Sequence, residues 1–253
     1  MNGRFLSVLM MASIMLLGCK KEEIASTDID LAIRFTFSVD RQELVLNSRQ
    51  YVNEAGNLYE VNEVKFFISD VKLQKSDGSS VIIGDVHYVE YGQNTICSWD
   101  IDNKIPAGDY TGISFTFGLS PAHNISNTHV NPPECDMAWP AVLGGGYHYM
   151  QINGKWETAD GTVKPFNLHT GRGQEYDSQG QITGYIDNQF EVFIDKVMQL
   201  NENASLKLNM NVNSWFNTPY VYDLDYWGGS IMQNQDAQEQ LKANGKDVFT
   251  ISL

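Results

Sequence analysis

The residues best suited to chemistry gather between positions 135 and 171. This stretch holds two of the five histidines, two methionines, two tryptophans and a cysteine. These residues are Cys135, Met137, Trp139, His148, Met150, Trp156 and His169. Imidazole and sulfur ligands suit copper and several other transition metals. If the protein binds a metal, we expect the site here.

His148 and Met150 stand two residues apart in a segment, 147–156, that alternates like a strand. Residues two apart on a strand share a face, so the imidazole and the thioether are expected on the same side. This pair suits copper. The alternative is structural: a methionine at such a position commonly fills a core, and a single histidine is commonly half-buried and hydrogen bonded.

Motifs of the common enzyme classes are absent from the sequence. It contains no nucleophile elbow, phosphate loop, dinucleotide-binding glycine motif, paired-histidine zinc motif or Cys-x-x-Cys. Neither a haem nor an iron–sulfur pattern occurs. The sequence therefore predicts a protein that binds a ligand and is not an enzyme.

The N-terminus predicts export. Residues 1–18 have one positive charge and then an apolar run that is shorter than the roughly 20 residues of a membrane-spanning helix, which is typical of a signal peptide. The run ends at Gly18-Cys19, which resembles a bacterial lipobox. We expect Cys19 to be lipidated and to anchor the protein to the membrane.

Residues 19–28 are polar and predict a solvated tether. The sequence Lys20-Lys21-Glu22-Glu23 also resembles the surface-export signal of some Gram-negative lipoproteins. The expected location is the outer membrane, with the protein facing the periplasm or the cell surface.

Charge and cysteine content limit the partners. A net charge of −14 argues against nucleic acid, because phosphate binding needs clustered Lys and Arg. With Cys19 lipidated, Cys97 and Cys135 remain. In an oxidising compartment they could form one disulfide or stay as two separate thiols.

Short strands separated by turns dominate the mature sequence. Strand-like alternation or apolar runs occur at 31–39, 58–73, 81–91, 113–119, 147–156, 163–169, 186–194 and 206–212. Helix formers at 236–243, followed by Asn244-Gly245, predict one short C-terminal helix. The predicted fold is all-β: one antiparallel β-sandwich domain over residues 29–253, with long loops.

The longest predicted connection runs from Pro121 to Gly146 and contains His123 and His129. Loops of this length inside a compact domain are often functional. We therefore add His123 to the candidate ligands.

Three groups of residues resemble the MbnP-like family of extracytoplasmic β-sandwich proteins. They are Met137-x-Trp139, Gly146-Tyr147-x-Tyr149-Met150-x-Ile152-x-Gly154 and Phe166-x-x-His169-x-Gly171. The resemblance extends to Val64 upstream and to Phe249 downstream, and so covers most of the mature chain.

The resemblance implies copper binding, because the characterised relatives hold copper with several histidines beside an oxidised tryptophan. It assigns Trp139 to the aromatic position and His169 to a ligand position. Further ligands would have to be recruited from His148, His123 or His129, and we expect His148 and His123 in this supporting role. At two positions where the relatives are expected to have histidine, this chain has Ala141 and Asn167. A copper-handling or electron-transfer protein is the expected partner.

The aromatic segment 215–227 supports a different function. Tyr and Trp combine a large contact area with a polar tip, which suits a surface that binds glycan or protein. Such a lipoprotein would have kept the fold and lost the metal. The rings could equally cap one end of the sandwich, and Asp223 and Asp225 could hold a calcium ion.

Overall fold

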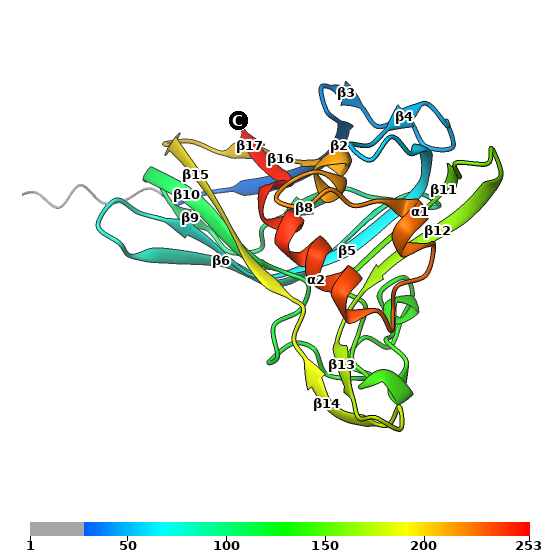
Figure 1. Cartoon of the computed structure of the whole chain (residues 1–253). Coiled ribbons are helices and arrows are strands. Elements are labelled where there is room, and N and C mark those ends of the chain that lie inside the picture. Colours follow the sequence, from blue (N-terminus) through cyan, green and yellow to red (C-terminus); the bar gives the residue numbers. More distant parts are fainter. Residues whose placement is uncertain (1–27) are drawn as a thin grey trace, which may run out of the picture.

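A computed structural model describes residues 28–253. The predicted signal peptide, Cys19 and nearly all of the tether lie outside the described residues. Two sheets pack face to face, and a lobe of loops projects from one of them (Figure 1). The predicted all-β sandwich is confirmed.

The larger sheet has eight strands. They are β4 (Tyr51–Val52), β5 (Leu58–Gln74), β6 (Ser80–Tyr91), β7 (Thr95–Ile96), β10 (Gly108–Phe117), β11 (Met150–Glu157), β12 (Val163–Thr170) and β15 (Phe190–Leu200). The 17-residue β5 is its central strand. Along one edge β5 pairs with β11 over residues 58–66 and then with β10 over residues 68–74, while β6 pairs along the other edge.

The second sheet has five strands. They are β2 (Leu31–Val39), β3 (Gln42–Glu43), β8 (Ser98–Asp100), β16 (Ala204–Asn211) and β17 (Phe249–Ser252). Two small ladders stand apart, β1 (Asp28–Ile29) with β9 (Ile105–Pro106), and β13 (Gly173–Tyr176) with β14 (Ile182–Ile186).

The helices are short. They are α1 (Leu224–Trp227), α2 (Gln235–Asn244), and the 3₁₀ turns η1 (Glu134–Met137), η2 (Ala141–Leu143), η3 (Val212–Phe216) and η4 (Gly245–Asp247). The predicted C-terminal helix corresponds to α2, which Asn234 caps by accepting a hydrogen bond from the amide of Ala237. Within residues 28–253, none of the helices has the length and apolar character needed to cross a bilayer.

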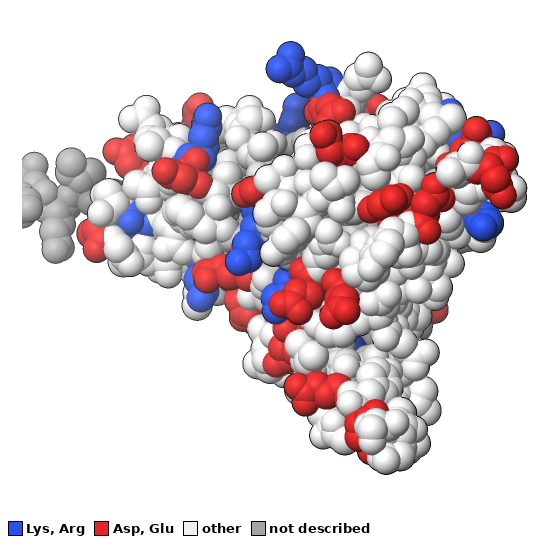
Figure 2. All heavy atoms as spheres, viewed as in Figure 1, with Lys and Arg blue, Asp and Glu red and all other residues white. Residues whose placement is uncertain are grey.

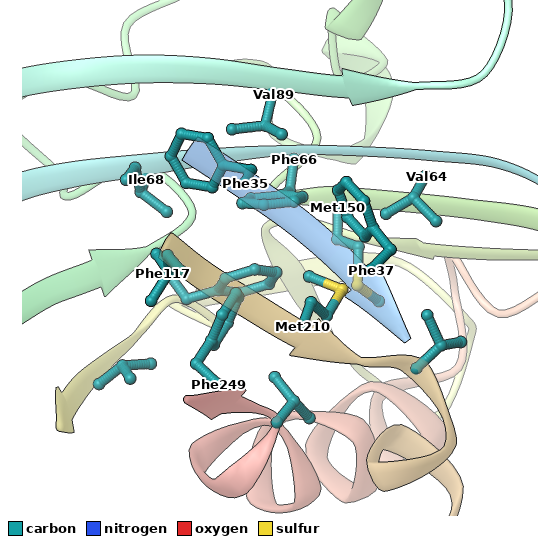
Figure 3. Packing of buried hydrophobic residues seen from close by; sticks show 14 of the residues in the cluster. Phe35, Phe37, Val64, Phe66, Ile68, Val89, Phe117, Met150, Met210 and Phe249 are labelled. Atoms are coloured by element: carbon teal, nitrogen blue, oxygen red, sulfur yellow. The ribbon is translucent and has the colours of Figure 1, made fainter. Parts of the chain in front are cut away.

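The main core lies between the two sheets. Phe35 and Phe37 of β2 meet Phe66 of β5, and Phe249 of β17 packs on Phe117 (Figure 3). Each of these rings is at most 6% exposed. Burying a side chain of this size stabilises the fold by about 1.5–3 kcal/mol, so the aromatic contacts hold the sheets together.

The sheet order contains one departure from the predicted antiparallel pattern. β16 pairs with β2 in parallel, from Ala204↔Leu31 to Asn211↔Ser38. Two parallel strands need a long connection between them. Here that connection includes all the strands of the larger sheet, which lie between β2 and β16 in the sequence. β17, which the sequence pattern did not predict, pairs with β16 antiparallel and is the last strand of the chain.

The disulfide alternative is wrong, because Cys97 and Cys135 are both free. Cys97 packs against the main core, and its Sγ donates to the carbonyl oxygen of Glu90 at 3.2 Å. Cys135 belongs to η1 in the lobe. Burial raises the pKa of the Cys97 thiol to about 11, so this thiol is protonated and poorly reactive.

Acidic side chains dominate the face seen in Figure 2, including the lobe. The chain has 31 Asp and Glu against 17 Lys and Arg. Such a surface attracts cations and repels polyanions.

His87 is a partly buried histidine outside the predicted site. Its ring stacks between Trp99, with centroids 4.5 Å apart, and Phe35, with centroids 5.5 Å apart. Its Nε2 is buried without a hydrogen-bond partner, and burial lowers the pKa of His87 to about 4.

We predict that this residue makes the fold sensitive to acid. The unfolded chain takes up the His87 proton near its ordinary pKa of about 6.5, whereas the folded chain does so only near pH 4. The free energy of unfolding should therefore fall by up to about 3 kcal/mol as the pH is lowered through this window. Urea unfolding of wild type and His87→Gln across the window measures the contribution.

In His87→Gln the free energy of unfolding should lose this part of its dependence on pH, while His123→Gln should keep it. An unchanged slope in His87→Gln would contradict the prediction.

Candidate functional site

The lobe begins where β10 leaves β5 and ends where β11 joins it. At that point the amide of Gly118 donates to the carbonyl of Phe67, and the amide of Phe67 donates to the carbonyl of Tyr149. Residues 118–149 then fold over the outer face of the larger sheet and form a second apolar cluster. Its buried members are Phe67, Tyr88, Leu119, Met137, Tyr147 and Tyr149. The lobe is thus packed on the sheet.

The three glycines at 144–146 let the lobe turn back towards β11. All three have positive φ, between 65° and 110°. The side chain of Asn124 lies against Gly146, accepts from the amide of Tyr147 at 2.8 Å and donates to the hydroxyl of Tyr149 at 3.1 Å. A Cβ at Gly146 would clash with this amide, so the close approach requires glycine.

A short ladder inside the lobe positions His148. The amide of Trp139 donates to the carbonyl of Gly146 at 2.9 Å, and the amide of His148 donates to the carbonyl of Met137 at 2.7 Å. The His148 ring turns to the same carbonyl, with Nδ1 at 3.0 Å from the Met137 oxygen. A carbonyl only accepts, so Nδ1 carries the proton and Nε2 holds a free lone pair.

That lone pair is buried. His148 is 6% exposed, and its Nε2 has no hydrogen-bond partner. Burial lowers the pKa of His148, although the hydrogen bonds to the lobe backbone at Met137 and Ala138 oppose the shift. A neutral imidazole with a buried, unpartnered acceptor costs free energy unless something binds it.

His169 lies beside it. The two ring centroids are 5.0 Å apart and the ring planes are at 90°. Burial, then the nearby His148 and the charge of Lys65, lower the pKa of His169 to about 3. Both imidazoles are therefore neutral at physiological pH, as metal ligands must be.

Trp139 completes the group. Its ring meets His148 edge to face, with centroids 4.7 Å apart, and its Nε1 donates to the carbonyl of Leu143 at 3.2 Å. Gly171 packs on the indole, where an added Cβ would lie 2.5 Å from the ring. Gln238 of α2 accepts from the amide of Gly171 at 3.1 Å and so braces this contact.

Comparison with known proteins identifies the family. The model of the MbnP family matches residues 28–233. The chain belongs to the MbnP family. MbnP from Methylosinus trichosporium has a similar structure, with a TM-score of 0.56 and 16% identity over 89% of this chain and 99% of that one. At that identity the likeness shows a shared fold. No curated protein sequence matches the chain.

The structure brings together three of the residues that sequence analysis assigned to an MbnP-like site, His148, His169 and Trp139. The third candidate ligand, His123, is engaged elsewhere, with its Nε2 3.4 Å from Asp70 Oδ1. His129 stacks on Phe67 in the apolar cluster. Within residues 28–253, no three His, Cys, Asp or Glu side chains gather as a metal site would require.

The expectation that His148 and Met150 share a face is wrong. β11 begins only at Met150, whose side chain packs in the main core (Figure 3). His148 precedes the strand, in the ladder with the lobe, so strand alternation does not reach it. The thioether of Met150 is therefore not beside the imidazole.

The two positions that lack the expected MbnP histidines are both exposed. Ala141 begins η2, and Asn167 lies on β12 two residues before His169. His148, from the lobe, is the imidazole that lies beside His169.

Asp223 and Asp225 have structural roles. Asp223 caps α1 by accepting from the amide of Asp225 at 2.9 Å. The carboxylate of Asp225 accepts from Trp156 Nε1 at 2.9 Å and from the amide of Ala159 at 3.1 Å. These oxygens already have donors, which does not favour a calcium site.

Sequence analysis missed Asn153, whose Oδ1 lies 2.8 Å from His169 Nε2. The sequence offered one weak signal: Asn153 lies on the predicted strand 147–156, on the same face as Gln151. Its contact with His169 depends on the register of β11 with β12, which pairs Gln151 with His169.

Proposed function

We propose that this MbnP-family protein binds copper between His148 and His169, with Trp139 beside the metal. The observation that carries the proposal is the buried His148 Nε2, which has no partner. Metal-bound histidines almost always donate their other ring N–H to a carbonyl, carboxylate or water. The bond from His148 Nδ1 to the Met137 carbonyl has this form.

The donor set favours a soft or borderline metal. Two neutral imidazoles supply nitrogen ligands that copper accepts well, and Cu(I) needs few donors. Within residues 28–253, no carboxylate joins the two imidazoles to form a site that calcium or magnesium would favour. The acidic surface favours the approach of a cation (Figure 2).

Membership of the MbnP family supports the same function, because copper binding is what the resemblance implies. We further propose a non-catalytic lipoprotein, anchored through Cys19 and located at the outer membrane, facing the periplasm or the cell surface. Its partner would be a protein that delivers copper, removes it or exchanges electrons with it.

We predict that the mature domain binds one Cu(I) and that His148→Ala and His169→Ala each abolish stoichiometric binding. Each substitution removes one of only two nitrogen ligands. The loss of affinity should therefore exceed the roughly 10–100-fold typical of changes to outer-shell residues. Titration against a competing Cu(I) chelator, followed by elemental analysis, measures both stoichiometry and affinity.

His123→Ala is the matched control and should bind as wild type does, because His123 pairs with Asp70. Binding that survives both His148→Ala and His169→Ala would rule out this site.

A second candidate function is glycan binding at the aromatic C-terminal segment. A shallow, open pocket of about 340 Å³ lies between α1 and α2. Its lining residues are Tyr220, Trp227, Asp236, Glu239 and Gln240. The neighbouring Tyr226 is 75% exposed and meets Trp227 edge to face at 4.8 Å. Rings beside carboxylates suit a sugar, which offers an apolar face and hydroxyl donors.

On this candidate function, Trp227→Ala should abolish binding to a glycan array, because it removes the ring that would stack on the sugar. Tyr185→Ala removes an exposed ring on β14 and should leave binding intact. Absence of any bound glycan with wild-type protein would eliminate the candidate.

A further inference from the structure

A polar array crosses the outer face of the larger sheet beside the two histidines. The strand register aligns His169 with Gln151, Gln151 with Lys65, and Lys65 with Glu90, across β12, β11, β5 and β6. Directly opposite residues on neighbouring strands share a face, so these side chains stand in one row. Asn153 and Glu63 form the adjacent row.

The amide of Asn153 has a fixed orientation. One of its polar atoms lies 3.3 Å from Glu63 Oε2, and the other lies 2.8 Å from His169 Nε2. A carboxylate only accepts hydrogen bonds, so the Asn153 nitrogen must face Glu63. The Asn153 oxygen therefore faces His169, and His169 Nε2 must donate to it.

Glu63 is itself held in place. Lys65 Nζ lies 2.6 Å from Glu63 Oε1 and 3.9 Å from Glu90 Oε1. Glu90 is 1% exposed and accepts from the hydroxyl of Tyr88 at 2.9 Å and from the amide of Asn94 at 3.0 Å. Burial alone would raise the pKa of Glu90, but these hydrogen bonds and Lys65 outweigh it and lower the pKa. The lysine is thus fixed between two carboxylates.

We propose that Asn153, oriented by Glu63 and Lys65, holds His169 as the Nε2–H tautomer and so makes Nδ1 its metal donor. The inference rests on the proposed copper site. His148 has the opposite tautomer, because its Nδ1 donates to Met137 and its Nε2 is free. The metal would therefore meet one Nε2 and one Nδ1. Asn153 is a positioning residue that never touches the metal.

The tautomer can be read in the metal-free protein. Long-range ¹H–¹⁵N correlation spectra of histidine-labelled protein distinguish Nε2–H from Nδ1–H imidazole. Wild type should show a single Nε2–H form for His169. In Asn153→Leu the acceptor is gone, and in Glu63→Gln the Asn153 amide is free to flip, so both variants should show a mixture of tautomers.

The matched control is Asn167→Leu. Asn167 lies on β12 directly opposite Asn153, so Asn167→Leu makes the same substitution on the same face of the sheet without removing the Asn153 oxygen that faces His169. It should keep the single tautomer. In Cu(I) titrations against a competing chelator, Asn153→Leu and Glu63→Gln should each bind one copper roughly 10–100-fold more weakly than wild type. Glu63→Gln keeps the test available if Asn153→Leu does not fold.

The His169 tautomer tests the role of Asn153, and Cu(I) binding by wild type tests the proposed function, so the two can fail separately. An Nδ1–H or mixed His169 in metal-free wild type, or an unchanged tautomer in both variants, would overturn the role of Asn153 whether or not copper binds. A single Nε2–H tautomer together with no Cu(I) binding by wild type would overturn the copper site, and with it the donor role of Nδ1.

Discussion

The hydrogen bond from His148 Nδ1 to the Met137 carbonyl lies at one end of the ladder that closes the lobe and links its two segments. In the same ladder Ala138 pairs with Tyr147, and the Trp139 amide bonds to Gly146. The contacts that fold the lobe therefore also set the histidine tautomer and place the indole beside it. A change in the packing of the lobe would therefore also change the positions of the His148 imidazole and the Trp139 indole.

Much of the architecture follows from local sequence. Alternation at 31–39 and 206–212 predicts two real strands, and the helix formers before Asn244 predict α2. The parallel pairing of β2 with β16 is different, because alternation fixes which face is buried and not which strands are neighbours. The same limit hides the contact between Asn153 and His169, which arises from register.

The site itself was predictable in part. The family signature locates Trp139 and His169, and the two come together with His148. The sequence then misleads twice. Spacing pairs His148 with Met150 because it cannot show that β11 begins after the histidine. The long predicted loop suggests His123 as a ligand, although Asp70 engages that residue. This chain has Ala141 and Asn167 where the resemblance leads us to expect histidines, and the proposed site takes its second imidazole, His148, from the lobe.

The central claim is that His148 and His169 share one metal ion, and X-ray absorption of the Cu(I)-loaded mature domain tests it most directly. The account predicts a first shell of nitrogen with the multiple-scattering features of two imidazoles and no sulfur, and it predicts that His148→Ala retains no stoichiometric copper with this spectrum. Sulfur in the first shell, which would point to Met137, Cys97 or Cys135, or a spectrum that His148→Ala leaves unchanged, would contradict the account.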